Sequence, residues 1–554
     1  MTHPSRLIEQ ALGEWAETLG SDAVLTGLNA TELYRTNELS AKRDIAAVLK
    51  PRGSSQLVAA VRTARKCGLP LYPVSTGCNW GYGAASPVVD DCVVVDLSKM
   101  NQIVDFDEEL GLVTVQPGVT PRQLRDFLDA RRSRWLVPVS GAGPQCSLIG
   151  NALERGYGVT PYVDHFSAVT SIEAVLPDGE IYRSALSAAG GAEIDQAFKW
   201  GVGPYLDGIF SQGAFGIVTE MTIALAPIPE EVVAFIFSLK AEEDLEPAII
   251  AVHEILKSVG NVLGSINLMN GHRMLAMVED YPFNRVEKGS LMTHSLVDDL
   301  LKKNFLGRWT LGGIVYGDRG LVKSAISLIK RRSAGIKCRK LFFNRKRINL
   351  LKAVARRLPG SQAAMLRKQL GNLDDAFNVA EGAPTETALK LCYWKSGQRP
   401  PEGQLMNPAR DGCGVIWYSP LVPMKPEKAR AYVDMVYRVC AEHRIEPLIT
   451  LTSLSHRCFD STVPILFDPR HADDTARAKK CYEALFEAGK ELGVLPYRVG
   501  IDHMGLIVRP DSTYWKLVAR LKEAIDPGGI IAPGRYCPTD HPHGAPECRL
   551  GENS

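Results

Sequence analysis

The segment Val74-Ser-Thr-Gly-Cys-Asn-Trp-Gly-Tyr-Gly-Ala-Ala-Ser-Pro87 has three glycines and two alanines between residues 77 and 85. It follows a short apolar run that ends at Pro73, and it precedes the strand-like sequence Cys92-Val-Val-Val-Asp-Leu97. Such a loop can turn through positive φ and bring its backbone N–H groups close to a ligand, commonly a phosphate. It matches neither GxxxxGK[ST] nor GxGxxG, which argues against a P-loop or a Rossmann motif. Taken alone, it is either a phosphate-binding loop or a tight connection between strands.

The composition is that of an ordinary globular protein of several domains. At 554 residues the chain is too long for one hydrophobic core, so two or three domains are expected. The net charge of +2 gives the whole molecule no attraction to polyanions. The N-terminus lacks an apolar signal core, and no apolar run has the length of a membrane span. The twelve cysteines have no metal-ligand spacing, which favours a reducing cytoplasm and no structural metal site.

Hydrophobic periodicity predicts helix and loop over residues 1 to 50 and an α/β arrangement from Ser54 onward. Thr120 followed by Pro121 predicts a capped helix that runs to Ala130. The other predicted helices are 7–19 and 56–67, and the predicted strands are 69–72, 92–97, 112–119, 169–176 and 216–225. Pro227 and Pro229 then mark a domain boundary.

Residues from 230 to about 490 have a different pattern, in which strands alternate with long amphipathic helices. The predicted strands include 232–239 and 414–419, and the predicted helices include 429–443 and 476–492. This pattern predicts an α+β domain whose sheet is covered by helices. Turns rich in Gly and Pro return after Tyr497.

One segment, from Lys323 to Lys368, departs from the near-neutral average. It contains fifteen Lys or Arg residues and no acidic residue, with apolar residues between them. One interpretation is a helix whose basic face is solvated and whose apolar residues form a stripe that packs on the core. The other is a surface for an acidic protein partner or an anionic membrane. No nucleic-acid module accompanies the segment, so a nucleic-acid partner is not expected.

Taken together, several motifs resemble the vanillyl-alcohol oxidase and p-cresol methylhydroxylase (PCMH) family of FAD-linked oxidoreductases. They occur in the family's order over nearly the whole chain. The matching stretches are Pro73–Gly83, Gly150–Gly156, Thr160–His165, Gly203–Gln212, Phe215–Thr219, Pro496–Arg498 and Asp526–Gly534.

The resemblance implies an α+β protein with a PCMH-type FAD-binding domain in two parts, of mixed sheets and helices. Residues 1–230 (core about 40–230) and 490–554 would form this domain. Residues 231–489 would form a cap with an antiparallel sheet over the flavin. The residues implied to bind FAD are Pro73, Val74, Ser75, Thr76, Gly77, Cys78, Asn79, Gly81, Gly150, Asn151, Glu154, Gly158, Val159, Asp164, Gly216, Ile217, Val218, Arg498 and Arg535.

The resemblance also implies a phenol site. Tyr82, Tyr497 and Arg498 match the family's set of two hydroxyls and one guanidinium around the substrate oxygen. Hydride leaves a benzylic carbon more easily when the para hydroxyl is ionised, because the electrons can flow to a p-quinone methide. A phenol with a pKa near 10 therefore needs groups that stabilise its anion. Asp164 matches an aspartate near the flavin that orients the reacting carbon or moves a proton.

Two departures from the family pattern carry predictions. Asp460 and Ser461 stand where a His that tethers FAD usually falls, and His456 lies a few residues too early. We therefore predict that FAD is bound without a covalent link. Cys78 and Trp80 replace the usual Arg and small residue, which predicts a reshaped substrate pocket.

Two other functions fit the same residues. One is a flavin dehydrogenase of a non-phenolic 2-hydroxy acid or alcohol, with Arg498 on the carboxylate. The other is a flavoprotein that docks a carrier or partner through its basic segment. Oxygen, a cytochrome or a quinone could each accept the electrons. A homodimer in the cytoplasm is expected, with peripheral membrane association as the alternative.

Overall fold

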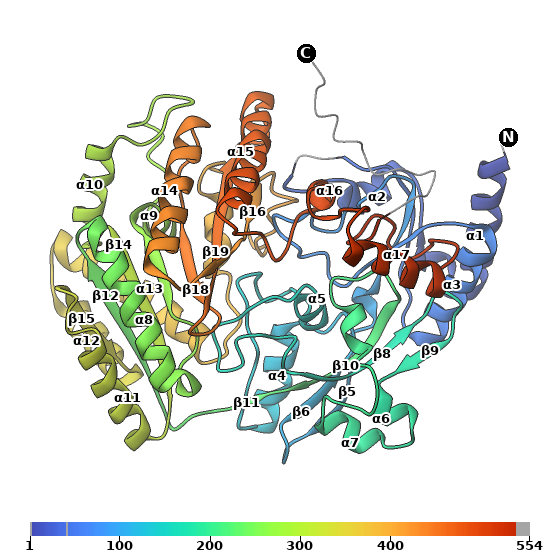
Figure 1. Ribbon diagram of the computed structural model, residues 1–554, viewed down its shortest axis with the longest axis horizontal. Helices are drawn as coiled ribbons and strands as arrows, with labels where there is room; N and C mark the ends of the chain where they lie inside the picture. The colour runs from blue at the N-terminus through green and yellow to red at the C-terminus, as the bar shows by residue number, and fades with distance from the viewer. Residues whose placement is uncertain (1–2, 40–41, 539–554) are drawn as a thin grey trace.

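A computed structural model of the protein describes residues 3–39 and 42–538. Figure 1 shows two lobes side by side. The N-terminal lobe is drawn from blue to teal and includes the red C-terminal segment, whereas the second lobe runs from green to orange.

The first sheet of the N-terminal lobe has the order β1 (Val24–Leu25), β2 (Ile45–Leu49), β4 (Cys92–Asp96) and β3 (Leu71–Val74). The strands β2, β4 and β3 are parallel. The helices α1 (His3–Leu19) and α3 (Ser54–Cys67) pack together, and the buried Trp15 donates its Nε1–H to the carbonyl of Ala60 at 3.1 Å. The prediction of only helix and loop before residue 50 is wrong, because β2 is a short apolar run that periodicity does not distinguish from helix.

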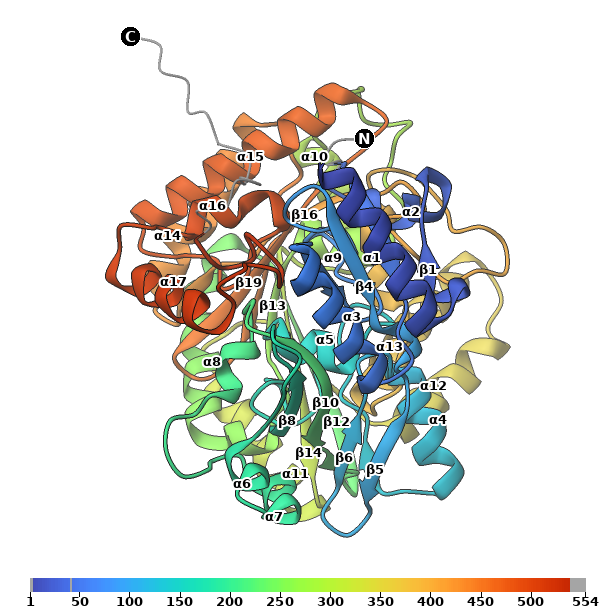
Figure 2. The same cartoon turned by 90° about the vertical axis from the view of Figure 1, so that its right-hand side faces the viewer.

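A second, antiparallel sheet has the order β5 (Ile103–Asp107), β6 (Leu112–Val115), β10 (Ile217–Ala224), β8 (Val169–Val175) and β9 (Ile181–Arg183). Figure 2 shows β5, β6, β8 and β10 close together in the lower half of the molecule. The predicted cap of α4 (Pro121–Arg131) is confirmed, since the Thr120 hydroxyl accepts from the Gln123 N–H at 3.2 Å. The short helix α5 (Leu148–Leu153) packs its apolar side chains into the core of this sheet.

The second lobe is built on an eight-stranded antiparallel sheet. Its order is β15 (Arg339–Phe343), β12 (Glu231–Leu239), β14 (Trp309–Gly317), β13 (Asn267–Asn270), β18 (Thr450–Ser453), β19 (Cys458–Phe467) and β16 (Gly414–Tyr418), with β17 (Leu421–Pro423) also on β19. One face is covered by α8 (Leu245–Val259), α11 (Arg319–Arg332), α14 (Pro426–Glu442) and α15 (Ala472–Glu491). The predicted antiparallel sheet with helices over it is therefore confirmed.

The other face of this sheet, here called the inner face, is turned toward the N-terminal lobe. Ser461 bonds to Tyr432 of α14, so its neighbours Asp460 and Thr462 lie on the opposite side of the sheet. The strand register shows which side chains lie on the inner face. They include Asn267, Thr310, Trp417, Thr450, Thr452, Asp460 and Thr462. The Trp417 N–H donates to the carbonyl of Gly81, which joins the inner face to the glycine-rich loop.

The C-terminal segment returns the chain to the first sheet. After α16 (Met504–Ile507) and α17 (Thr513–Ile525), Ile531 pairs with Leu71 in parallel. The Leu71 N–H donates to Ile530 and the Ala532 N–H to Leu71, each at 2.7 Å. This pairing places Arg535 beside the glycine-rich loop.

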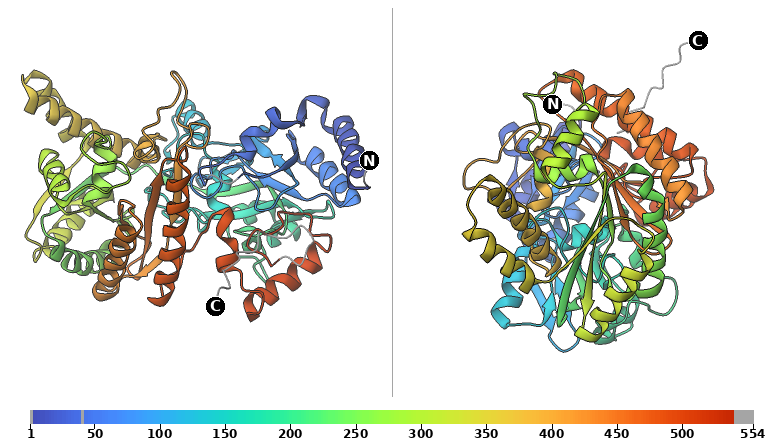
Figure 3. Two further views of the ribbon diagram at one scale, coloured as in Figure 1. Left: turned by 90° about the horizontal axis from the view of Figure 1, so that it is seen from above. Right: turned by 90° about the vertical axis from the view of Figure 1, so that its left-hand side faces the viewer.

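The basic segment forms α11, β15, α12 (Arg345–Arg357) and α13 (Ser361–Ala380), at the end of the molecule away from the N-terminal lobe (Figure 3). Val322 and Ile329 of α11 are buried, as expected for a helix that turns one apolar face to the core. Arg345 pairs with Asp374 and Glu381, so this cation is not part of a free basic surface. No helix in 3–39 or 42–538 is long and apolar enough to cross a membrane.

Candidate active site

The glycine-rich loop after β3 has the geometry of an anion-binding loop. Gly77, Gly81 and Gly83 have φ of +72°, +74° and +118°. Within the described chain, the backbone N–H groups of Ser75 to Asn79 donate to no protein acceptor, and the buried Thr76 hydroxyl has no partner. Unpaired amides in a tight loop bind phosphate oxygens. The loop therefore fits the diphosphate of FAD.

A second element of the site is α5 with the loop that follows it. A Cβ on Gly150 would lie 3.2 Å from the Ser75 hydroxyl, so α5 and the glycine-rich loop lie in near contact. Asn151 Nδ2 lies 2.5 Å from Nδ1 of the buried His165. Burial lowers the pKa of His165 to about 4, so the ring is neutral at pH 7. A side chain at Gly158 would clash with this ring, which explains the glycine there.

Glu154, at the end of α5, bridges two guanidinium groups from the C-terminal segment. One oxygen lies 3.1 Å from Arg498 Nε, and the other pairs with Arg535. Arg535 also donates to the Tyr72 hydroxyl at 2.6 Å. The side chains of all three charged residues are nearly buried, between 12% and 14% exposed. The ion pairs hold both arginines in fixed positions.

Tyr82, Tyr497 and Arg498 lie close together in the structure. The Arg498 guanidinium carbon lies 4.1 Å from the centre of the Tyr82 ring, and Arg498 also donates to the side chain of Asn79. The Tyr82 hydroxyl is 2.8 Å from the hydroxyl of Ser419, whose carbonyl accepts from the Tyr497 N–H. Burial raises the pKa of both tyrosines, so both hydroxyls stay protonated and able to donate at neutral pH.

Asp460 on the inner face is the functional candidate that sequence reasoning missed. It is 5% exposed, and its Oδ1 has no hydrogen-bond partner within the described residues. Burial raises its pKa to about 7, and the positive charge of Arg498 opposes this shift. Its charge in turn raises the pKa of Tyr497 beyond the effect of burial. The signal in the sequence that could have identified it is an acidic residue in the otherwise mainly apolar strand 458–467.

Comparison with known proteins identifies the fold and its relatives. A model of an FAD binding domain matches residues 45–185. The 1'-carboxy-chondrochloren decarboxylase of Chondromyces crocatus is 34% identical over 536 residues, 96% of this chain and 97% of that protein. The flavoprotein subunit of 4-cresol dehydrogenase [hydroxylating] from Pseudomonas putida is 25% identical and covers 95% of both chains.

The chain belongs to the PCMH-type family of FAD-linked oxidoreductases. The 4-ethylphenol oxidase of Gulosibacter chungangensis, solved as an isoeugenol complex, has the same fold. Its TM-score is 0.86 at 23% identity, with 96% of this chain and 97% of that chain covered. The protein is therefore an FAD-dependent enzyme, and its glycine-rich loop lies inside the matched FAD binding domain.

Other residues that the family resemblance implied make structural contacts of their own. The Asp164 carboxylate accepts from the Ser167 N–H at 3.1 Å and thus holds a turn. Ile217 and Val218 lie in β10, where they pair with β8. The Val159 carbonyl accepts from the hydroxyl of Tyr316 in the second lobe at 3.1 Å. Asp164 also pairs through its backbone with Tyr157, and the ring centre of Tyr157 lies 5.5 Å from that of Tyr497. One residue therefore separates Asp164 from Tyr497.

The two unusual loop residues point toward neighbouring segments. Trp80 donates its Nε1–H to the Ala142 carbonyl at 3.0 Å and packs on Leu389 of the second lobe. The Cys78 thiol is within 3.6 Å of the Thr76 carbonyl and 3.5 Å of the Gln145 carbonyl. Burial raises the pKa of Cys78 to about 12, so it stays a thiol. Both side chains fix the loop against residues 142–145.

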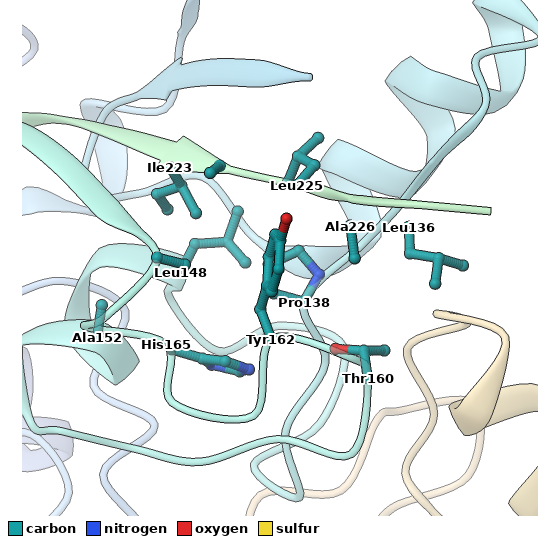
Figure 4. Close-up of a pocket in the computed structure, with 12 residues that line it drawn as sticks. Leu136, Pro138, Leu148, Ala152, Thr160, Tyr162, His165, Ile223, Leu225 and Ala226 are labelled. Atoms are coloured by element: carbon teal, nitrogen blue, oxygen red, sulfur yellow. The ribbon is translucent and has the colours of Figure 1, made fainter. Parts of the chain in front are cut away.

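Figure 4 shows a pocket next to α5, with mostly apolar walls. His165, Thr160 and Tyr162 are its polar lining residues, and Tyr82, Tyr497, Arg498 and Asp460 do not line it. The buried Nε2 of His165 has no partner in the described structure. The pocket is thus separate from Tyr82, Tyr497, Arg498 and Asp460. Among the described residues, no group of three or more His, Cys, Asp or Glu is placed to hold a metal ion.

Proposed function

We propose that this enzyme oxidises a para-substituted phenol at its benzylic carbon. The observation that supports this best is the meeting of Tyr82, Tyr497, Arg498 and Asp460 between the two lobes. In this proposal, residues 1–230 and 490–554 form the FAD-binding domain, and residues 231–489 form the cap that closes the substrate site.

The charged groups of the site suit the ionisation of a phenol. Glu154 offsets one of the two arginine charges, and an ionised Asp460 offsets the other. When the phenol loses its proton to Asp460, the net charge of the site stays constant. Arg498 and the two tyrosine hydroxyls then stabilise the phenolate oxygen. Asp460 is therefore proposed as the proton acceptor, with a pKa suited to neutral pH.

When bound, FAD supplies the acceptor for the hydride that leaves the benzylic carbon, so that the substrate becomes a p-quinone methide. The chain holds FAD through the loop from Pro73 to Asn79, through α5 and through Arg535. Asp164 is proposed to lie near the reacting carbon, as the family pattern implies, although its carboxylate is held by the Ser167 N–H.

Anaerobic mixing with 4-alkylphenols tests the proposal. We expect 4-ethylphenol to bleach the flavin absorbance within one turnover, whereas its methyl ether, which has no ionisable hydroxyl, leaves the flavin oxidised. Bleaching by D-lactate but by no phenol would instead support the 2-hydroxy acid dehydrogenase. A flavin that neither class bleaches would support a docking flavoprotein.

A second candidate is oxidative decarboxylation of such a phenol. It is supported by the 34% identity with a decarboxylase, against 25% with the cresol dehydrogenase. After hydride loss, CO₂ would leave from the carbon next to the benzylic carbon. The electron pair of the broken C–C bond would form the side-chain double bond and restore the phenolate. Release of labelled CO₂ from a substrate labelled at its carboxylate distinguishes this outcome from hydroxylation.

A further inference from the structure

Arg273 is a partly buried cation of the second lobe that forms no ion pair with a carboxylate of residues 3–39 or 42–538. It lies in the first turn of α9 (Gly271–Val278), where its N–H donates to the Asn270 side chain at 3.0 Å. Its Nε donates to the Thr450 hydroxyl at 3.0 Å, and its buried Nη1 has no partner among the described residues. A buried guanidinium nitrogen without a partner is unusual, because its desolvation is not repaid by a hydrogen bond or an ion pair.

The surroundings of Arg273 offer no charge that could replace the missing anion. Burial lowers the pKa of Arg273 to about 10, so the group stays protonated at neutral pH. A thiolate at Cys392 would offset this charge, but burial raises the pKa of the Cys392 thiol and keeps it neutral. The hydroxyl of Thr310, on the same inner face, is also buried without a partner in the described chain. Arg273 and Thr310 thus provide unpaired hydrogen-bond donors and a positive charge.

The position of Arg273 connects this cluster to the phenol site. Its partner Thr450 pairs with Thr462, which lies two residues from Asp460 on β19. With ordinary strand spacing, Thr450 and Asp460 are about 8 Å apart along the inner face. On the other side, Cys392 lies close to the buried Glu38, which in turn lies close to Gly81 of the glycine-rich loop. Arg273 therefore lies across the inner face from the residues that hold the phenol oxygen, at a separation that suits a phenol with a short side chain.

We propose that Arg273, with the hydroxyls of Thr450 and Thr310, binds a carboxylate carried by the para side chain of the substrate. This assignment rests on the proposed phenol oxidation and names the substrate class as phenols with an anionic side chain. The planar fork of a guanidinium matches a carboxylate in two hydrogen bonds. The substrate would span the site, with its phenol oxygen at Arg498 and its carboxylate at Arg273.

Equilibrium binding of a matched ligand pair tests this assignment without turnover. 4-Hydroxycinnamate and its primary amide share one shape and differ in charge, and neither has a saturated benzylic carbon to oxidise. We expect calorimetric titration of the oxidised holoenzyme to show at least about tenfold tighter binding of the acid. Arg273→Gln should abolish this preference and leave the affinity for the amide unchanged. Arg438→Gln, an exposed arginine of α14, serves as the matched control.

The outcomes separate this inference from the proposed function. Equal binding of acid and amide to the wild-type enzyme, while 4-ethylphenol still bleaches the flavin, would overturn the carboxylate subsite alone. Failure of every phenol to bind or to bleach the flavin would overturn the proposed function. If Arg273→Gln does not fold, Thr450→Val removes the bond that orients Arg273 and should weaken only the binding of the acid.

Discussion

Glu154 and Asp460, two carboxylates near Arg498, differ in whether they form ion pairs. Glu154 forms ion pairs with Arg498 and Arg535, so its charge is fully used in the folded protein. The Oδ1 of Asp460 has no hydrogen-bond partner in the described part of the chain, and burial is the main influence on its pKa. Asp460 can therefore take up a proton near neutral pH, whereas Glu154 holds the two arginines in place.

Asp460 should therefore control the pH dependence of the reaction. With a pKa of about 7, it is ionised and able to accept the phenol proton only above that pH. We expect the rate of anaerobic flavin reduction at low 4-ethylphenol concentration to rise through pH 7 in the wild-type enzyme. Asp460→Asn should lower this rate by about 10²-fold and remove the inflection. An unchanged profile in the variant would exclude Asp460 as the proton acceptor.

The same residue predicts a change in stability with pH. Its pKa is raised from 3.8 to about 7 in the folded state, so the folded protein binds the proton more tightly than the unfolded chain. This contribution stabilises the fold at low pH and is lost as pH rises from about 4 to about 7. Asp460→Asn should gain stability relative to the wild type between pH 5 and pH 8, measured by urea unfolding. Asp434→Asn, on the exposed face of α14, should show no such trend.

At the level of elements, the glycine-rich loop is locked between the two lobes. A Cβ on Gly81 would clash with the Trp417 ring of β16, and its φ of +74° also disfavours any other residue. We expect Gly81→Ala to lower the free energy of unfolding by about 2 kcal/mol and to weaken FAD binding. Gly13→Ala in α1, where a Cβ meets no atom within 4 Å, should be neutral or stabilising. Equal effects of the two substitutions would contradict this account of the loop.

Strand β19 bears on the prediction that FAD is not covalently attached. Asp460 and Ser461 lie within it, and Ser461 faces α14 through its bond to Tyr432. His456 precedes the strand, and its carbonyl bonds to His253 of α8. We expect acid precipitation of the holoenzyme to leave the yellow flavin in the supernatant. Flavin that stays with the precipitated protein would show a covalent link and contradict the prediction.

At the level of the whole molecule, α12 presents an exposed stripe of mixed character. Leu350 is 66% exposed and Val354 50%, and the exposed cations Lys346, Arg347, Arg356 and Arg357 lie around them. Apolar side chains flanked by cations favour an anionic membrane surface over an acidic protein surface. This stripe lies at the end of the molecule away from the N-terminal lobe, so it would bring the enzyme to its electron acceptor and would not bind the substrate.

We expect the protein to sediment with vesicles that contain phosphatidylserine and not with vesicles of phosphatidylcholine alone. Replacing Lys346, Arg347, Arg356 and Arg357 by Gln should weaken this binding at least about tenfold, since each cation near the surface adds about 1 kcal/mol. Anaerobic flavin reduction by 4-ethylphenol should stay unchanged. Binding to neither vesicle would leave an acidic protein partner as the alternative for this surface.

The sequence by itself determined the features that depend on local chain chemistry. The glycines of the loop between residues 77 and 83, the Thr120 cap and the alternating strand 217–224 follow from backbone preferences and periodicity. Tyr82, Tyr497 and Arg498 were predicted from the family resemblance, because each belongs to a short motif that matches the family. The strand β2 was missed, since its five apolar residues carry no period.

Only the tertiary structure decided which polar groups are buried together and which lack a partner. Glu154 reaches two arginines that lie more than 340 residues away in the chain. Strand register places Asp460 and Thr450 on one face of the sheet, and Arg273 of α9 donates to Thr450 on that face. The free energy of a charge depends on its depth and its neighbours in space, and chain order records neither.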